Sequence, residues 1–215
     1  MIQTIQFLNG HKVAQQVTTR EAFLALRNSA ANLSNLQRAR QGDTDAKAHL
    51  VQFAYNDLMP DGKVAGCCHP SGCFFHDIDC YGDRGERLPQ SQEEIKQLIL
   101  SKKDEIGLLM LERSVGGGWH LVCRLELGKT ILENQVRIAS ILKIEMDTNC
   151  HDLGRVVYST SGSPEDLVYL DDALFENTLS IEDSEREYQL LKERARKGLE
   201  QVPKGAKSDQ KHYRP

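Results

Sequence analysis

Apolar and polar positions follow two periods along the chain, and together these periods predict an α+β fold. Apolar residues recur at helical spacing in some stretches, and short apolar runs bounded by glycine, proline or polar residues lie between them. The predicted helical regions are 18–58, 91–105, 130–146 and 180–201. The predicted strands are a short one at the N-terminus and 63–69, 72–80, 106–115, 118–127, 154–161 and 165–172.

The order of elements after residue 71 is strand, helix, strand, strand, helix, strand. This split β-α-β order is typical of ferredoxin-like sheets and of sheets like the RNA-recognition motif (RRM-like), in which helices cover one face of an antiparallel sheet. We expect an N-terminal α/β unit to pack against the other, open face. The predicted domain is 1–178, made of an N-terminal part of about 1–70 and an RRM-like part of about 71–178. A charged helix and basic tail follow over 179–215.

Composition places few limits on function. The 215 residues are 40% hydrophobic and 27% charged, as in ordinary globular proteins. No apolar run approaches the roughly 20 residues that cross a bilayer, and the first residues lack the pattern of a secretory signal. We therefore expect a cytoplasmic protein with no membrane partner. Residues 192–215 carry eight Lys or Arg and three acids, which fits a solvated tail or an electrostatic contact with nucleic acid.

Two carboxylates close an apolar strand in the stretch CFFHDIDCYGD, which begins at Cys73. Residues i and i+2 of a strand point to one face, so Asp77 and Asp79 should project together while Ile78 enters the core. Two close carboxylates repel each other unless a cation lies between them. Mg²⁺ or Mn²⁺ would supply that cation, although D-x-D alone also fits an ordinary solvent-facing strand end.

A glycine-rich turn lies between two later strands. Ser114 precedes it, Gly116, Gly117 and Gly118 form it, and His120 follows within the next strand. Glycines allow a phosphate chain to approach the backbone closely. The same residues also fit a plain hairpin turn.

A third polar stretch follows the helix predicted over 130–146. Asp147 comes at the end of that helix, and Arg155 opens the next strand with a guanidinium suited to binding phosphate. A third carboxylate that reached Asp77 and Asp79 would complete a metal site. Asp152 competes with Asp147 for this position.

Taken together, the three stretches resemble the three motifs of the archaeo-eukaryotic primase superfamily. These motifs are a hydrophobic strand ending in D-x-D, a Ser/Gly-rich turn leading to a strand histidine, and an apolar-Asp step with an arginine about eight residues later. The chain is most similar to the primase-polymerase branch, in particular to the N-terminal domain of virulence-associated E-type proteins of bacterial mobile elements. The resemblance covers about residues 45–175.

The resemblance implies a DNA primase or polymerase activity. A 3′ hydroxyl would attack the α-phosphate of a nucleoside triphosphate on a single-stranded DNA template, and a helicase, fused or separate, would be a partner. Two Mg²⁺ or Mn²⁺ ions would be held by Asp77, Asp79 and Asp147. The catalytic residues would be these three acids and His120. The nucleotide-binding residues would be Ser114, Gly117, Gly118, His120 and Arg155.

Other classes of function fit parts of the same pattern. One is an inactive nucleic-acid-binding module that serves replication, and another is a metal-dependent phosphoesterase. The presence of all three acids and the histidine favours the nucleotidyltransferase.

The crowded cysteines raise the question of a zinc site. Cys67, Cys68, Cys73 and Cys80 lie close together in the sequence, with His69 between them. Two separate CxxC pairs, the strong zinc signal, are absent. We therefore expect reduced, buried thiols rather than zinc.

Overall fold

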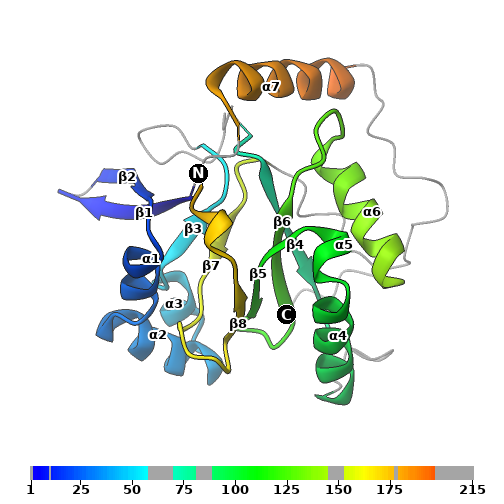
Figure 1. Ribbon diagram of the computed structural model, residues 1–215. Helices are drawn as coiled ribbons and strands as arrows, with labels where there is room; N and C mark the ends of the chain where they lie inside the picture. The colour runs from blue at the N-terminus through cyan, green and yellow to red at the C-terminus, as the bar shows by residue number, and fades with distance from the viewer. Residues whose placement is uncertain are drawn as a thin grey trace.

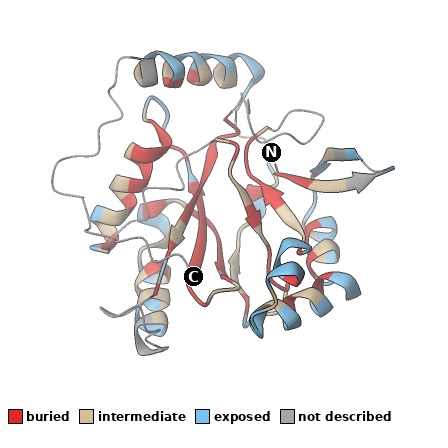
Figure 2. Cartoon of the chain, turned by 180° about the vertical axis from the view of Figure 1, so that it is seen from behind, coloured by how far each residue is buried: buried red, intermediate tan, exposed pale blue. Residues whose placement is uncertain are grey.

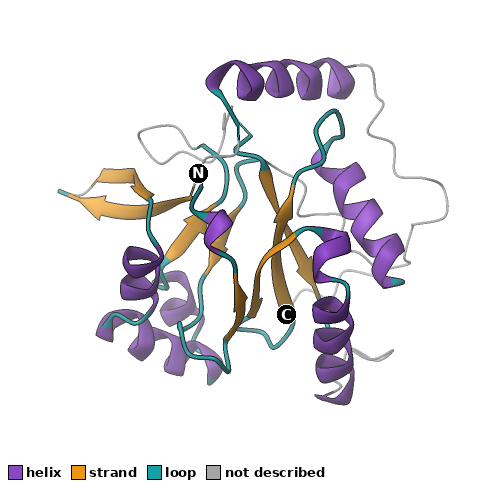
Figure 3. Cartoon of the chain, viewed as in Figure 1, coloured by secondary structure: helices purple, strands orange, loops and turns teal. Residues whose placement is uncertain are grey.

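The structure is a computed structural model that describes residues 2–9, 11–57, 70–80, 89–144, 153–176 and 179–196. Two antiparallel four-stranded sheets, ordered β2-β1-β3-β7 and β4-β6-β5-β8, form its centre (Figure 1). Helices flank both sheets (Figure 3), and the predicted α+β class is confirmed. The strands are β1 Ile2–Leu8, β2 His11–Val17, β3 Gln52–Ala54, β4 Cys73–Ile78, β5 Leu108–Arg113, β6 Trp119–Arg124, β7 Val156–Tyr158 and β8 Leu167–Leu170. The helices are α1 Arg20–Arg27, α2 Ala30–Arg40, α3 Thr44–Ala48, α4 Pro89–Ser101, α5 Lys103–Ile106, α6 Ile131–Leu142 and α7 Ile181–Arg196, with a 3-10 turn at Asp172–Leu174.

The first sheet differs from the sequence prediction at β3. The N-terminal strand forms a hairpin with β2, and β3 pairs with β1 on one side and β7 on the other. The prediction of helix up to residue 58 was therefore wrong, because α3 ends at Ala48 and a strand follows. Phe53 and Ala54 are fully buried in this strand, so tertiary pairing and burial outweigh the local helical pattern.

The second sheet places β6 between β4 and β5, all antiparallel. Helices α4 and α5 connect β4 to β5, which gives the predicted strand–helix–strand–strand order. The strand predicted over 154–161 was expected to join this sheet, and that expectation was wrong. β7 pairs with β3 in the first sheet, while β8 lies beside β5. Val157 of β7 is 5% exposed in a core shared by the two sheets. The burial of this side chain explains why β7 lies in the first sheet.

Alternating residues of the second sheet supply two separate cores, and the strands of this sheet are largely buried (Figure 2). One face packs against α4, α5 and α6 through a cluster that includes Phe74, Ile99, Leu121 and Ile138. The opposite face packs against the first sheet and α1 through a cluster that includes Phe23, Phe53, Phe75, Met110 and Val122. The N-terminal elements therefore cover much of the face opposite these helices.

The two later helices are fixed by polar contacts. Helix α6 begins with a capping box, in which the Thr130 hydroxyl accepts from the Glu133 N–H and the Glu133 carboxylate accepts from the Thr130 N–H. In α7, Glu187 accepts from the Gly128 N–H at 2.9 Å. The strand predicted over 63–69 and the tail beyond residue 196 lie outside the described residues. None of the described helices has the length and apolar character needed to cross a membrane.

Candidate active site

A pocket of about 270 Å³ brings together residues that are far apart in the sequence. The strand end of β4, the turn between β5 and β6, the start of β7 and helix α3 all contribute to its walls. Five of the predicted site residues line it: Asp77, Asp79, Ser114, His120 and Arg155. Sequence reasoning missed Lys47 and Tyr158, which also line the pocket.

The D-x-D pair lies on the predicted face. Phe75, Asp77 and Asp79 all line the pocket, while Ile78 is 2% exposed in the core on the helix-covered side. The period of two residues along a strand explains this arrangement. Asp77 and Asp79 thus both face the same pocket, and carboxylate oxygens are ligands that hard cations prefer.

The third predicted metal ligand stays a prediction. Asp147 and its competitor Asp152 belong to the stretch 145–152, which lies outside the described residues. Within the described part of the chain, no group of three or more His, Cys, Asp or Glu side chains is arranged to hold a metal ion. Among the described residues, the carboxylates that line the pocket are those of Asp77 and Asp79.

A row of polar side chains crosses the second sheet at the pocket. Asp77 on β4, His120 on β6 and Glu112 on β5 are direct neighbours in the strand register, so all three project from the same face. His120 Nε2 lies 3.9 Å from Asp77 Oδ1, and His120 Nδ1 lies 3.1 Å from Glu112 Oε1. The imidazole thus lies between one pocket carboxylate and one interior carboxylate.

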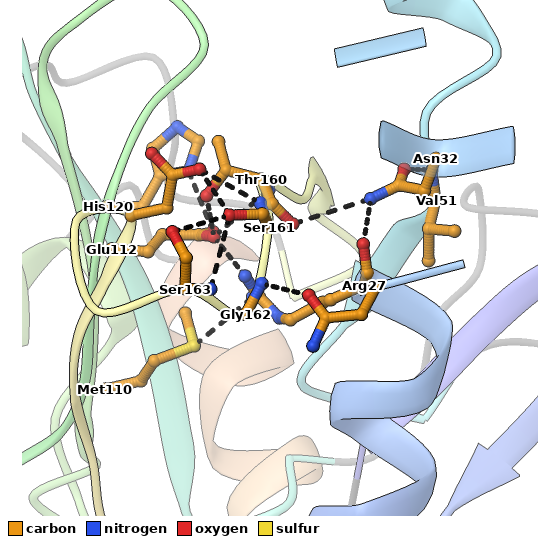
Figure 4. Close-up of polar contacts among 12 residues, drawn as sticks. Arg27, Asn32, Val51, Met110, Glu112, His120, Thr160, Ser161, Gly162 and Ser163 are labelled. Atoms are coloured by element: carbon orange, nitrogen blue, oxygen red, sulfur yellow. Dashed lines mark hydrogen bonds and ion pairs between the residues drawn. The ribbon is translucent and has the colours of Figure 1, made fainter. Parts of the chain in front are cut away.

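Glu112 is buried with a charged partner from the N-terminal unit (Figure 4). Arg27 Nη1 lies 2.6 Å from Glu112 Oε2, and both side chains are 0% exposed. Burial raises the pKa of Glu112, but the Arg27 charge and the hydrogen bond from His120 outweigh it and set this pKa at about 2. Sequence reasoning missed this pair, although a charged residue in the apolar run LLMLER was an available signal.

The glycine turn has a defined structural role. Gly117 has a positive φ of 95°, and the Ser114 hydroxyl accepts from the Gly118 N–H at 2.8 Å. Gly116 lines the pocket, whereas Gly117 and Gly118 are not among its lining residues. A Cβ atom on Gly118 would lie 2.5 Å from the Ile78 carbonyl oxygen. Gly118 therefore lets the turn approach the end of β4, next to Asp79.

Replacing Gly118 with Ala should destabilise the protein by about 1–3 kcal/mol, because the new methyl group overlaps backbone atoms that cannot move freely. Urea denaturation of the wild type and the variant would measure this loss. Gly42→Ala is a matched control, because a Cβ there meets no atom within 4 Å and only its positive φ of 96° opposes the change. A Gly118→Ala protein with wild-type stability would contradict the proposed steric role.

The pocket also has a cationic side. Lys47 on α3 and Arg155 just before β7 line the same cavity as Asp77 and Asp79. The Lys47 side chain is exposed, and that of Arg155 is partly buried. A pocket with two carboxylates and two cations is suited to an anionic ligand that carries a divalent ion.

The described cysteines are buried free thiols. Cys73, Cys80 and Cys123 have this state, whereas Cys67 and Cys68 lie outside the described residues. Burial, Asp79 and Asp77 raise the pKa of Cys80 to about 11. This thiol, which lies beside the D-x-D pair, is therefore protonated at neutral pH.

No family model, curated protein or solved structure matches this chain. Its function is therefore inferred from the geometry and chemistry of the pocket.

Proposed function

We propose that the protein is a template-dependent nucleotidyltransferase of the primase-polymerase type. One observation carries this proposal: a single pocket collects Asp77, Asp79, Ser114, His120 and Arg155. These residues come from the three stretches that resemble the motifs of the archaeo-eukaryotic primase superfamily.

The two pocket carboxylates fit a magnesium or manganese site. Mg²⁺ prefers oxygen ligands and is often held by one or two protein carboxylates, while substrate phosphates complete its coordination. Asp77 and Asp79 would supply the protein oxygens, and Asp147 is proposed as the third ligand. When bound, divalent ions lower the pKa of the attacking 3′ hydroxyl and neutralise charge on the leaving pyrophosphate.

The cationic side of the pocket would bind the triphosphate. Arg155 offers a planar donor fork that matches phosphate oxygens, and Lys47 offers a mobile ammonium. His120 faces the same cavity between Asp77 and Glu112. These groups would orient the α-phosphate of the incoming nucleotide toward the carboxylate side, where the reaction requires it.

The fold supports the same proposal in part. β6 lies between β4 and β5, and α4 to α6 cover one face of this sheet, which is consistent with the proposed RRM-like core. The position of β7 in the first sheet departs from a simple four-stranded RRM. Because β7 and Arg155 adjoin the pocket, this departure brings a cation to the site.

The direct test is nucleotide incorporation. The full chain would be incubated with primed or unprimed single-stranded DNA, ribo- or deoxyribonucleoside triphosphates, and Mg²⁺ or Mn²⁺, and products would be resolved on denaturing gels. We expect extension products that disappear when EDTA is added.

Two other results would overturn this proposal and identify a different function. Binding of DNA and nucleotides without product under every condition would favour the inactive replication-accessory module. Release of phosphate from nucleotides without extension would favour the phosphoesterase.

Arg155→Ala and Lys47→Ala should each raise the KM for the nucleoside triphosphate about tenfold, because each removes a charge-assisted contact worth about 1.4 kcal/mol or more. Steady-state extension assays at varied nucleotide concentration would measure this change. Lys102→Ala is the control, since Lys102 pairs with Glu105 on the surface and does not line the pocket. Unchanged KM values in both pocket variants would contradict the assignment of the triphosphate site.

A further inference from the structure

We propose that Glu112 positions the imidazole of His120 toward the pocket, and that Arg27 and Thr160 fix Glu112 in the orientation this requires. Glu112, Arg27 and Thr160 would be positioning residues, because none of them lines the pocket. The proposal depends on the proposed function only in that His120 is taken to contact the nucleotide.

A hydrogen bond and a ring contact hold the imidazole of His120 in place. Glu112 Oε1 lies 3.1 Å from Nδ1, and an ionised carboxylate can only accept a hydrogen bond. Nδ1 must therefore carry the proton of this hydrogen bond. In the neutral ring this fixes the tautomer in which Nε2 is unprotonated and faces Asp77 and the cavity. The Phe75 ring meets the imidazole edge-on with centroids 5.2 Å apart, and this contact restricts rotation of the ring.

Three donors surround one oxygen of the Glu112 carboxylate. Its Oε2 atom accepts from Arg27 Nη1 at 2.6 Å, from the Thr160 hydroxyl at 3.0 Å and from the Thr160 N–H at 3.3 Å. These three donors occupy one carboxylate oxygen and leave the other directed at His120. A fully buried carboxylate needs such partners, since burial of an unpaired charge is costly.

These donors come from segments outside the second sheet. Arg27 comes from α1, 85 residues before Glu112, and its guanidinium lies 4.4 Å from the Phe23 ring centroid and 5.4 Å from that of Phe53. Thr160 follows β7, on the side of the first sheet (Figure 4). Through Arg27, the N-terminal unit thus contacts Glu112, the residue that holds His120 on the side away from the pocket. Docking of that unit would thereby complete the site.

Nitrogen NMR of the full chain labelled with ¹⁵N-histidine would test the proposal without DNA or nucleotide. His120 would be assigned by its loss in a His120→Asn variant. In the neutral ring, the protonated and unprotonated nitrogens have well-separated shifts, and we expect the proton on Nδ1. A wild-type proton on Nε2, or an even mixture of the two tautomers, would overturn the proposal.

Variants of Arg27 and Glu112 test whether these residues cause the tautomer preference of His120. In Arg27→Met/Glu112→Leu we expect the preference for a proton on Nδ1 to be lost. Calorimetry should show about tenfold weaker binding of ATP·Mg²⁺ or dATP·Mg²⁺, because His120 loses the hydrogen bond that orients it. Arg27→Lys keeps a cation beside Glu112 and should keep the wild-type tautomer. Arg40→Met is the matched control, because it breaks the Arg40–Asp166 ion pair, which does not touch His120.

Each outcome bears on the proposal. A folded double variant that retains the Nδ1–H form refutes it, as does loss of that form in Arg40→Met. If the double variant does not fold, the His120 tautomer in the wild-type and Arg27→Lys spectra decides whether the proposal holds. If the expected tautomer is found but the protein makes no extension product under any condition, the positioning role stands and the nucleotidyltransferase proposal fails.

Discussion

Replacing Asp77 and Asp79 together with Asn should lower nucleotide incorporation by a factor on the order of a thousand or more, because the change removes the two carboxylates that would hold divalent ions at the reacting phosphate. Asn preserves the side-chain volume, so the strand and pocket should keep their shape. Removing two neighbouring negative charges should leave the free energy of unfolding unchanged or slightly higher. Primer-extension rates and urea denaturation would measure the two effects separately.

The matched control is a second pair of neighbouring acids. Asp104 and Glu105 lie on α5, and neither lines the pocket. Asp104→Asn/Glu105→Gln makes the same charge change, so it should retain wild-type extension. Equal product from the Asp77/Asp79 variant and the wild type would rule out these residues as catalytic metal ligands.

Arg27→Met alone should destabilise the protein by about 3–5 kcal/mol, because it leaves the buried Glu112 carboxylate without its cation. Glu112→Leu alone should lower the free energy of unfolding by a similar amount, because it leaves the buried Arg27 charge without its carboxylate partner. The double variant Arg27→Met/Glu112→Leu should be more stable than either single variant, since an apolar pair replaces the ion pair without leaving an isolated charge. Chemical denaturation of all four proteins would give the double-mutant cycle.

A surface ion pair provides the comparison for this cycle. Arg20 lies 2.6 Å from Asp172, but the two side chains are 35% and 77% exposed. Arg20→Met should therefore cost less than about 1 kcal/mol. Two results would contradict the coupling of Arg27 and Glu112 that their geometry indicates. One is a loss of less than about 1 kcal/mol in the free energy of unfolding for each buried single variant. The other is a loss in the double variant that equals the sum of the two single losses.

Local periodicity in the sequence determined several elements and the direction of their side chains. The run CFFHDI alternates two faces, so it predicted both β4 and the shared direction of Asp77 and Asp79. The apolar spacing after Thr130 predicted α6. Such features depend on neighbours within a few residues, which the sequence displays directly.

The sequence predicted the glycine turn but not the roles of its individual glycines. The three glycines before Trp119 indicated a tight turn, and the structure contains one. Gly117 and Gly118 were predicted to bind nucleotide, yet in the structure one provides a positive φ and the other a close approach to Ile78. The need for glycine at Gly118 came from a strand 40 residues earlier in the chain, which no local pattern reveals.

The sequence by itself thus determined the α+β class, the strands around the D-x-D pair and the residue types that suggest phosphate chemistry. Only the tertiary structure decided that residues 52–54 form a strand, that β7 joins the first sheet, and that Lys47 lines the pocket. It alone decided that Arg27 pairs with Glu112 behind His120. The physical reason is that periodicity records which face of an element is buried, whereas the partner on that face is chosen by packing and charge compensation between distant segments.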